Sequence, residues 1–426
     1  MTFLFHSIMR PGAQRELKKI GNADLVIGIP TYANHLKTVA NVARAALEGA
    51  QLHFPHLRTV LVNADAGSKP RVRRAVATVP ANGQSAIVAG RYGLELGRGN
   101  AVAAILDAAL ALGAKAIVIL DGHTESITPS WLPGLAELIL EGQADLVMPR
   151  YHWPLPAGAL SDLIFYPLSR SLWGLSVRHP AAGDCAIAPG LAQALLEQDV
   201  WHTEIARFGF EVWLSTFAAT EGWRLAQSAL GLKCYTPPRR ASHFPAVFRD
   251  AVGTILRQVS LRRQAWFDVA RFDSAPTLTR FADKHDGEPI PEADYEPLVD
   301  ALALGWADHR DLWRRVMLPE NLAAVEALAS QAVDRFHFPP NLWARVVYDF
   351  GVVYNKGERD PNRIVDALYP LYQGRLASFW QEVAGLTVVG REGTVAAQAV
   401  EFEHARDYLK KRWQDYQPWL HSDEER

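Results

Sequence analysis

The chain has 426 residues, more than one ordinary hydrophobic core accommodates, so its length predicts two or three domains. Hydrophobic residues make up 49% and charged residues 21% of the sequence, which is typical of a globular protein and excludes a disordered one. The 44 Lys and Arg residues nearly balance the 46 Asp and Glu residues, giving a net charge of −2. This balance disfavours nucleic acid or an anionic membrane as a partner and favours small-molecule chemistry.

The cysteines and the N-terminal segment indicate the cellular compartment. Cys185 and Cys234 are too few for a disulfide framework and lack the spacing of a zinc site, which predicts free thiols in a reducing compartment. The first 20 residues place their basic residues after the apolar run, the reverse of a signal peptide. No segment has the roughly 18 uninterrupted apolar residues of a membrane span. We therefore expect a cytoplasmic protein without integral membrane contact.

The first half of the chain alternates short β-branched runs with helical stretches. Continuous apolar strands separated by helices predict an α/β fold with a mostly parallel sheet and helices on both faces. Strands are predicted over 25–30, 59–63, 85–89 and 116–120, with helices over 35–49 and 101–112 and a later strand-like run over 232–235. The predicted divisions are an N-terminal extension over 1–23, an α/β domain over 24–250 and an all-α domain over 251–426.

Beyond residue 250 helical stretches replace the strand-like runs, and a polar stretch over 273–297 is typical of a linker. The helices that follow carry tryptophans on their faces: Trp306, Trp313, Trp343, Trp380 and Trp413. These faces either pack within the protein, against the first domain, or support a homo-oligomer.

The carboxyl ends of the predicted strands are polar, and ligands of parallel sheets gather at this edge. The polar segments are Pro30–Asn34, Asp65–Ser68, Gly97–Asn100 and Asp121–His123. Four polar segments on one edge indicate a binding site.

Asp121 and His123 are candidate metal ligands because they stand two residues apart directly after an apolar strand. A carboxylate and an imidazole suit Mn²⁺ or Mg²⁺, with diphosphate oxygens in the remaining positions. The alternative is an aspartate that merely closes the strand as a turn or cap residue. His243 follows two arginines, a setting that suits phosphate, although a lone histidine is more often structural.

Arg98 and Glu211 are the other charged candidates. Arg98 lies in a glycine-flanked loop before a helix, where backbone amides and a guanidinium can face an anion together. The loop is not a dinucleotide fingerprint, because Val102 takes the place of its third glycine, and an ordinary glycine-rich connection is the alternative. Glu211 is the one carboxylate in the apolar segment Phe208–Leu214, which marks either a site or a favourable helix N-terminus.

Seven short motifs, taken together, resemble a known family. They are GIPTYAN, NADAGS, GRGNA, ILDGHTESITPSW, RHPAAGDCAI, FGFEVWL and RASH. Their order and spacing resemble the retaining glycosyltransferases of the mannosylglycerate synthase and glucosyl-3-phosphoglycerate synthase group. The resemblance covers roughly Asp24 to Asp250, and more loosely the helical part. It implies a GT-A-like fold, which binds nucleotide-diphospho-sugars, with an added helical region.

The resemblance implies transfer of a hexose from UDP-glucose or GDP-mannose to a small acceptor such as glycerate or 3-phosphoglycerate, with retention of configuration. The implied nucleotide-sugar pocket comprises Pro30, Thr31, Asn34, Asp65, Arg98 and Gly183. The implied metal ligands are Asp121, His123 and His243, and the implied catalytic residues are Arg98, Asp184 and Glu211. The group usually has aspartate where this chain has His123, which indicates a changed ligand.

An acceptor carboxylate or phosphate also requires a basic partner. Arg150, Arg170 and Arg178 lie in the appropriate part of the chain, and a surface salt bridge is the alternative role for each.

Two other functions remain open. A sugar-1-phosphate nucleotidyltransferase requires a glycine-rich, basic signature directly after the first strand, and Pro30–Asn34 lacks one. A non-catalytic sugar-nucleotide-binding scaffold would retain the pocket while the Asp121–His123 motif decayed.

Overall fold

The computed structural model describes residues 8–32, 34–81, 83–153, 158–235, 244–267, 277–278, 290–357 and 360–418. Contacts between Cα atoms divide the chain into two compact units. The α/β unit comprises Met1–Pro154, Val177–Ser242 and Ala275–Lys284, and the helical unit comprises Leu155–Ser176, His243–Ser274 and His285–Arg426. The helical unit therefore includes Leu155–Ser176, which precede the later strands of the α/β unit, so a single division after residue 250 does not separate the two units.

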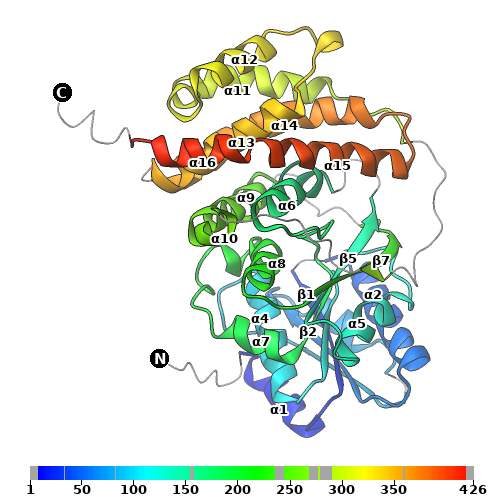
Figure 1. Cartoon of the computed structure of the whole chain (residues 1–426). Helices are drawn as coiled ribbons and strands as arrows, with labels where there is room; N and C mark the ends of the chain where they lie inside the picture. The colour runs from blue at the N-terminus through cyan, green and yellow to red at the C-terminus, as the bar shows by residue number, and fades with distance from the viewer. Residues whose placement is uncertain are drawn as a thin grey trace. The chain divides into compact units, whose positions relative to one another are not determined.

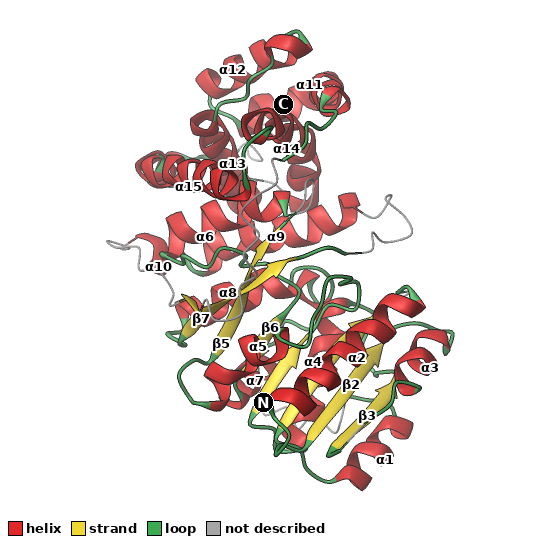
Figure 2. Cartoon of the chain, turned by 90° about the vertical axis from the view of Figure 1, so that its right-hand side faces the viewer, coloured by secondary structure: helices red, strands yellow, loops and turns green. Residues whose placement is uncertain are grey.

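An eight-stranded sheet of order β3-β2-β1-β4-β6-β5-β7-β8 forms the centre of the α/β unit (Figure 2). The strands are β1 Leu25–Thr31, β2 Thr59–Asp65, β3 Ser85–Gly90, β4 Ala116–Ile119, β5 Leu146–His152, β6 Cys185–Ile187, β7 Leu225–Leu232 and β8 Thr277–Leu278. All neighbouring strands pair in parallel except β6, which is antiparallel to β4 and β5. The predicted mostly parallel sheet is confirmed.

Helices cover both faces of this sheet, as predicted. The helices of the unit are α1 Pro11–Ile20, α2 Leu36–His53, α3 Arg71–Ala77, α4 Arg98–Ala111, α5 Trp131–Leu140, α7 Pro189–Leu196 and α8 Phe210–Thr220, with a 3-10 turn at Glu204–Ala206. Helix α2 packs with α3 and α5, whereas α4 packs with α7 and α8. Figure 1 shows α4, α7 and α8 on one side of the sheet and α2 and α5 on the other.

Close packing of α4 on the sheet depends on a missing side chain in β1. A Cβ atom on Gly28 would lie 2.4 Å from Cγ2 of Ile105, so only glycine allows this approach. Residues 101–106 of α4 are all buried, because their small and aliphatic side chains fill the space against the strands.

The strand predicted over 232–235 is wrong, because β7 spans Leu225–Leu232 and ends where that run begins. Strand β7 has the sequence LAQSALGL, in which Ala, Gln, Ser and Gly have little intrinsic preference for strands. Pairing with β5 over seven residues determines its conformation instead.

The second unit is helical, as predicted. Its elements are a π-helix at Ser161–Phe165, α6 Tyr166–Trp173, α9 Phe244–Leu261, α10 Arg263–Phe267, α11 Glu296–Val316, α12 Pro319–Ala329, a 3-10 turn at Val333–Arg335, α13 Pro340–Lys356, α14 Pro361–Val383, α15 Val388–His404 and α16 Arg406–Asp415. Most of the predicted linker over 273–297 lies outside the described residues. None of the described helices is both long and apolar enough to cross a membrane.

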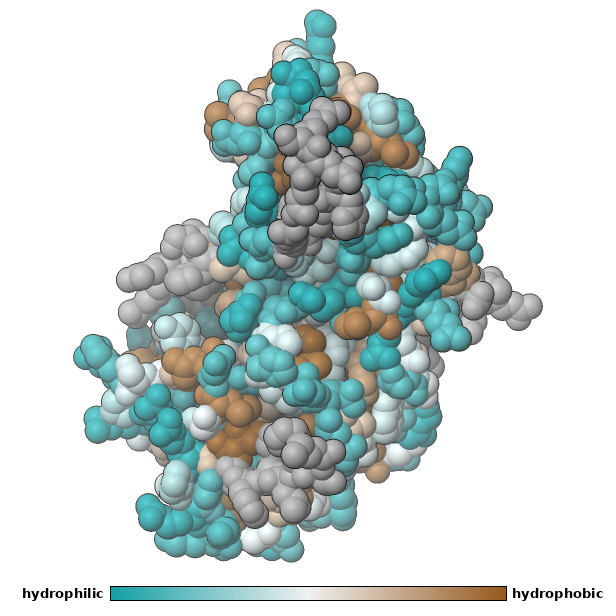
Figure 3. Space-filling model, turned by 90° about the vertical axis from the view of Figure 1, so that its left-hand side faces the viewer, coloured by the Kyte–Doolittle hydropathy of each residue, from teal (hydrophilic) through white to brown (hydrophobic). Residues whose placement is uncertain are grey.

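Three of the five tryptophans named above are buried in the core of the helical unit. Trp313 donates its indole N–H to the carbonyl of Ala367 at 2.9 Å, and Trp343 donates to that of Leu163 at 2.8 Å. Trp413 is also buried. The face drawn in Figure 3 is mostly hydrophilic over this unit. These tryptophans therefore stabilise the unit internally.

Candidate functional site at the carboxyl edge of the sheet

The predicted site residues of the α/β unit lie where its parallel strands end. Thr31 closes β1, Asp65 closes β2, and Asp121 follows β4. Because β6 runs in the opposite direction, its first residue, Cys185, pairs with Ile119 at the end of β4. Reversal of this one strand therefore brings the preceding Asp184 to the same edge. The first turns of α4 and α8 add Arg98 and Glu211.

Asp121 and His123 lie together, as the metal motif requires. Oδ1 of Asp121 accepts a hydrogen bond from the His123 backbone N–H at 3.0 Å. The same oxygen lies 3.2 Å from Nδ1 of the His123 ring. Asn34 reaches this histidine from the end of β1, with Nδ2 3.2 Å from Nδ1. The side chains of Asp121 and His123 are 22% and 31% exposed, so a ligand can reach them.

The charges around Asp121 keep its carboxylate ionised. Burial acts to raise the pKa of Asp121, but Lys233, His123 and Arg98 together hold it well below its usual range. An ionised carboxylate is the form that binds a metal cation.

Arg98 and Glu211 form an ion pair across the edge, from Nε to Oε1. Arg98 also donates from Nη2 to the carbonyl oxygen of Gly183 at 2.7 Å. Burial acts to lower the pKa of Arg98, but Glu211 and Asp121 outweigh it and raise the pKa, so the guanidinium remains a permanent cation. A Cβ atom on Gly183 would lie 2.8 Å from Arg98 Nη2 and 3.3 Å from Asp121 Oδ2, so glycine allows the two charged groups to approach.

Asp184 lies behind Asp121, with no exposed side-chain surface. Its Oδ1 accepts the backbone N–H of Asp121 at 2.7 Å, and its Oδ2 accepts hydrogen bonds from Tyr151 and Lys233. Protein donors therefore occupy both oxygens, an arrangement that favours holding Asp121 over touching a sugar directly.

Asp65 is the centre of a second polar cluster at the ends of β1 and β2. Its Oδ1 accepts a hydrogen bond from the Thr31 hydroxyl at 3.0 Å and another from the Gly67 backbone N–H at 3.1 Å. Its Oδ2 pairs with Arg73 of α3 at 2.6 Å. Asn63 donates to the Thr31 hydroxyl oxygen at 3.0 Å. Pro30 is buried beside this cluster, which fixes the predicted nucleotide-binding segment.

The site fits a divalent cation in part. His243 lies outside the described residues, as do the two arginines before it. Across the described part of the chain, no three His, Cys, Asp or Glu side chains are grouped as metal ligands. Asp121 and His123 supply two. Mg²⁺ commonly uses one or two protein ligands and completes its shell with water and phosphate oxygens, so the donor chemistry of this pair is suitable.

The three arginines considered for the acceptor lie in different places. Arg150 is exposed on β5 of the α/β unit. Arg178 is buried in the same unit, where its backbone N–H donates to Gln227 Oε1 at 2.7 Å. Arg170 belongs to the helical unit and forms a 2.5 Å ion pair with Glu403.

Lys233 is the charged residue of the site that sequence reasoning missed. It follows β7 directly and is 2% exposed, with its ammonium group paired to Asp184. The same group lies 4.8 Å from the ring centroid of Tyr151. No local signal marked it, because the strand predicted over 232–235 contains Lys233, whereas β7 ends just before it at Leu232.

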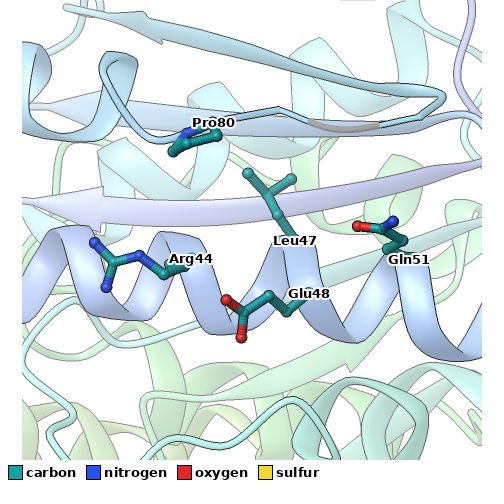
Figure 4. Close-up of a pocket in the computed structure, with 5 residues that line it drawn as sticks. All are labelled: Arg44, Leu47, Glu48, Gln51 and Pro80. Atoms are coloured by element: carbon teal, nitrogen blue, oxygen red, sulfur yellow. The ribbon is translucent and has the colours of Figure 1, made fainter.

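A pocket of about 110 Å³ lies elsewhere on the α/β unit, between α2 and the segment after α3 (Figure 4). It is lined by Arg44, Leu47, Glu48, Gln51 and Pro80. None of these residues belongs to the cluster around Asp121.

The sequence matches no protein-family model and no curated protein. Several solved structures are similar to it. Glucosyl-3-phosphoglycerate synthase from Mycobacterium tuberculosis, in complex with Mn²⁺, UDP and glucosyl-3-phosphoglycerate, is 19% identical with a TM-score of 0.42, over 59% of this chain and 86% of that one. Mannosyl-3-phosphoglycerate synthase from Rubrobacter xylanophilus is 16% identical with a TM-score of 0.36, over 61% and 80%. A mannosyltransferase from Pyrobaculum calidifontis, in complex with GDP-Man and Mn²⁺, is 13% identical with a TM-score of 0.39, over 95% and 94%.

Proposed function

We propose that the protein is a metal-dependent, retaining glycosyltransferase. It moves a hexose from a nucleotide diphosphate sugar, UDP-glucose or GDP-mannose, to a small acceptor such as glycerate or 3-phosphoglycerate. The supporting observation is the convergence of two pairs on one sheet edge, Asp121 with His123 and Arg98 with Glu211. Gly183 joins them, because Arg98 bonds its carbonyl oxygen and Asp121 lies beside its Cα.

The charge balance of this cluster supports a cation requirement. The carboxylates of Asp121, Asp184 and Glu211 outnumber the cations Arg98 and Lys233, and both cations are already ion-paired. An anionic diphosphate would add further negative charge. A divalent cation bound by Asp121 and His123 would supply the compensating positive charge and polarise the leaving phosphate.

Arg98 and Glu211 contribute the fixed part of the site. Arg98 is a permanent cation in the first turn of α4, so it suits the leaving diphosphate. Glu211 is ion-paired with Arg98, and this pairing reduces its strength as a nucleophile. We assign Glu211 to positioning Arg98 and the sugar or acceptor hydroxyls, with departure and attack on one face of the sugar.

The Asp65 cluster suits the nucleoside end of the donor. Thr31 and Asp65 are held in place by Asn63 and Arg73, so little ordering remains to be done when a ligand binds. We assign Asp65, whose carboxylate is buried and bonded on both oxygens, to positioning Thr31 and Arg73 beside the base or ribose, with Pro30, Thr31 and Asn34 lining the pocket. Gly183 and Asp184 belong to the loop facing the transferred sugar, and Asp184 acts there by holding Asp121.

A donor-by-acceptor activity screen tests the proposal. Purified protein is incubated with UDP-glucose or GDP-mannose, with glycerate or 3-phosphoglycerate, and with Mn²⁺, Mg²⁺ or EDTA, and products are followed by NMR. We expect one donor–acceptor pair to react with retention of configuration and EDTA to stop turnover. Asp121→Asn should reduce turnover by at least about a hundredfold, which is the usual loss when one electrostatic contact to a transition state is removed. Lys115→Ala, which removes only an exposed ion pair with Asp24, is the matched control.

The same screen, extended to nucleoside triphosphates with sugar 1-phosphates, separates the competing functions. Donor binding without turnover for every acceptor would favour the scaffold. Pyrophosphate release from a nucleoside triphosphate and a sugar 1-phosphate would favour the nucleotidyltransferase. Either result contradicts the transferase.

Glu211→Ala tests the assignment of that residue. Because Glu211 holds Arg98 in place, we expect turnover to fall far more than donor affinity, as measured by kcat beside a donor titration. A fully active variant would rule the assignment out.

A further inference from the structure

Lys233 is a buried cation that the proposed reaction does not yet use. Its side chain is 2% exposed, and burying a charge is costly unless partners compensate for it. The compensation comes from the carboxylate of Asp184, which is fully buried, and from the ring of Tyr151. Lys233 follows β7 directly, and its backbone N–H donates to the carbonyl of His152 at 2.9 Å, so the end of the β5–β7 pair fixes its position.

These buried groups hold Asp121 at two points. Asp184 accepts the backbone N–H of Asp121 at 2.7 Å. The ammonium group of Lys233 lies 3.7 Å from Oδ2 of Asp121. Oδ1 of Asp121 turns instead toward His123. The carboxylate therefore has one oxygen facing the buried cation and the other facing the second candidate metal ligand.

We propose that Lys233 is a positioning residue for the metal-binding carboxylate of Asp121, and that Asp184 and Tyr151 hold Lys233 for this purpose. The inference rests on the proposed function, since it takes Asp121 as a metal ligand. Lys233 orients Asp121 electrostatically, so that Oδ1 points toward His123. Outer partners of metal ligands commonly act in this way, and their loss typically costs about 10- to 100-fold in metal affinity.

A purely structural ion pair is the competing explanation, and paired variants distinguish the two. Lys233→Met leaves Asp184 buried without its cation and also removes the charge facing Asp121. The double variant Asp184→Asn/Lys233→Met removes both buried charges, so no unpaired charge remains to destabilise the fold. Tyr151→Phe removes one hydrogen bond to Asp184 and leaves the ion pair intact.

The test is Mn²⁺ binding in the presence of UDP and, separately, of GDP, followed by electron paramagnetic resonance without acceptor. We expect Mn²⁺ to bind at least tenfold more weakly to Lys233→Met and to the double variant, and less than threefold more weakly to Tyr151→Phe. Arg391→Met is the matched control, because it breaks a buried ion pair with Asp162 in the helical unit. It should bind Mn²⁺ like the wild type.

Two outcomes would overturn the inference. Wild-type Mn²⁺ affinity in the double variant would mean that Lys233 only neutralises Asp184. Equal weakening in Arg391→Met and Lys233→Met would mean that general destabilisation explains the effect. Asp121→Asn separates this inference from the proposed function. Undiminished Mn²⁺ binding in Asp121→Asn would contradict the proposed transferase. Weak Mn²⁺ binding in Asp121→Asn together with normal binding in Lys233→Met would contradict only the role of Lys233.

Discussion

The Lys233–Asp184 pair of the α/β unit and the Arg391–Asp162 pair of the helical unit are buried to nearly the same degree. Their side chains are 2% and 0% exposed in the first pair and 4% and 0% in the second. The difference lies in what each pair contacts next. Asp184 bonds the backbone of Asp121, whose carboxylate is 22% exposed.

The surroundings of Asp162, in contrast, are buried side chains of the helical unit. Gln398 donates to the Asp162 carbonyl at 2.8 Å and accepts from Arg375 at 2.9 Å, and both of these residues are buried. A buried charge therefore does not mark a site by itself. Its connection to a charged group that a ligand can reach is the more informative feature.

The largest expected effect tests the structural half of this comparison. Arg391→Met leaves the carboxylate of Asp162 buried without its cation, so we expect a loss of about 3–5 kcal/mol in the free energy of unfolding. Urea denaturation measures it. Turnover per folded molecule should stay at the wild-type value, and a loss of turnover in fully folded protein would break the comparison.

Arg98→Met tests the functional half. It removes the fixed cation that we assign to the leaving diphosphate, so kcat should fall about a hundredfold, which corresponds to about 2.7 kcal/mol in the transition state. Steady-state kinetics with the donor identified by the screen measures it. Unchanged kcat would place Arg98 with Arg391 among the structural residues.

The pH dependence of stability sharpens the comparison at two carboxylates. In the helical unit, burial raises the pKa of Asp349 more than Tyr408, Asn321 and Arg412 lower it. The folded state therefore binds this proton more tightly than the unfolded state. The resulting stabilisation is fully present below the ordinary aspartate pKa of about 3.9 and is lost as the pH rises through the folded pKa.

Asp121 should show the opposite sign. Its pKa is lowered in the fold, so its stabilising contribution is present above about 3.9 and is lost as the pH falls toward the folded pKa. Denaturation curves of the wild type, Asp349→Asn and Asp121→Asn across the acid range measure both. The stability difference between wild type and variant should fall with rising pH for Asp349 and rise for Asp121. Slopes of the same sign would contradict this.

The smallest expected effect comes from an exposed ion pair. Lys115, whose side chain is 67% exposed, pairs with Asp24 at 2.9 Å. Lys115→Ala should change the free energy of unfolding by less than about 0.5 kcal/mol, because water and salt screen such pairs. Thermal denaturation and kcat should both match the wild type. A large change in either would show that exposure is a poor guide to the importance of a charge in this protein.

The strands that sequence patterning located are those whose own residues determine their conformation. The predicted runs from Leu25, Thr59, Ser85 and Ala116 match β1 to β4 within two residues at each end. These strands are apolar and β-branched because both faces of the sheet are covered. Strand β7 was misplaced, since its small and polar residues become a strand only through pairing with β5.

Part of the candidate site could be predicted from the sequence for the same reason. Asp121, His123, Arg98 and Glu211 stand next to recognisable strand ends or helix starts, so topology alone predicts their convergence. Lys233 could not be predicted as a site residue, because lysine is ordinarily a surface residue and no local pattern shows that its ammonium group is buried. The pairing of Arg73 with Asp65 was missed too, because it depends on the docking of α3 beside β2.

The reversed direction of β6 has a consequence for how this edge of the sheet tolerates changes of sequence. The polypeptide enters β6 at the carboxyl edge of the parallel strands, so Gly183 and Asp184 reach the cluster immediately before the strand begins. Exchanges at the partly exposed Ala181, close before them, would alter the surface beside the cluster. The ladder between β4, β6 and β5 would keep its register meanwhile. Under the proposed function, such exchanges would change the preference for the acceptor while the sheet stays the same.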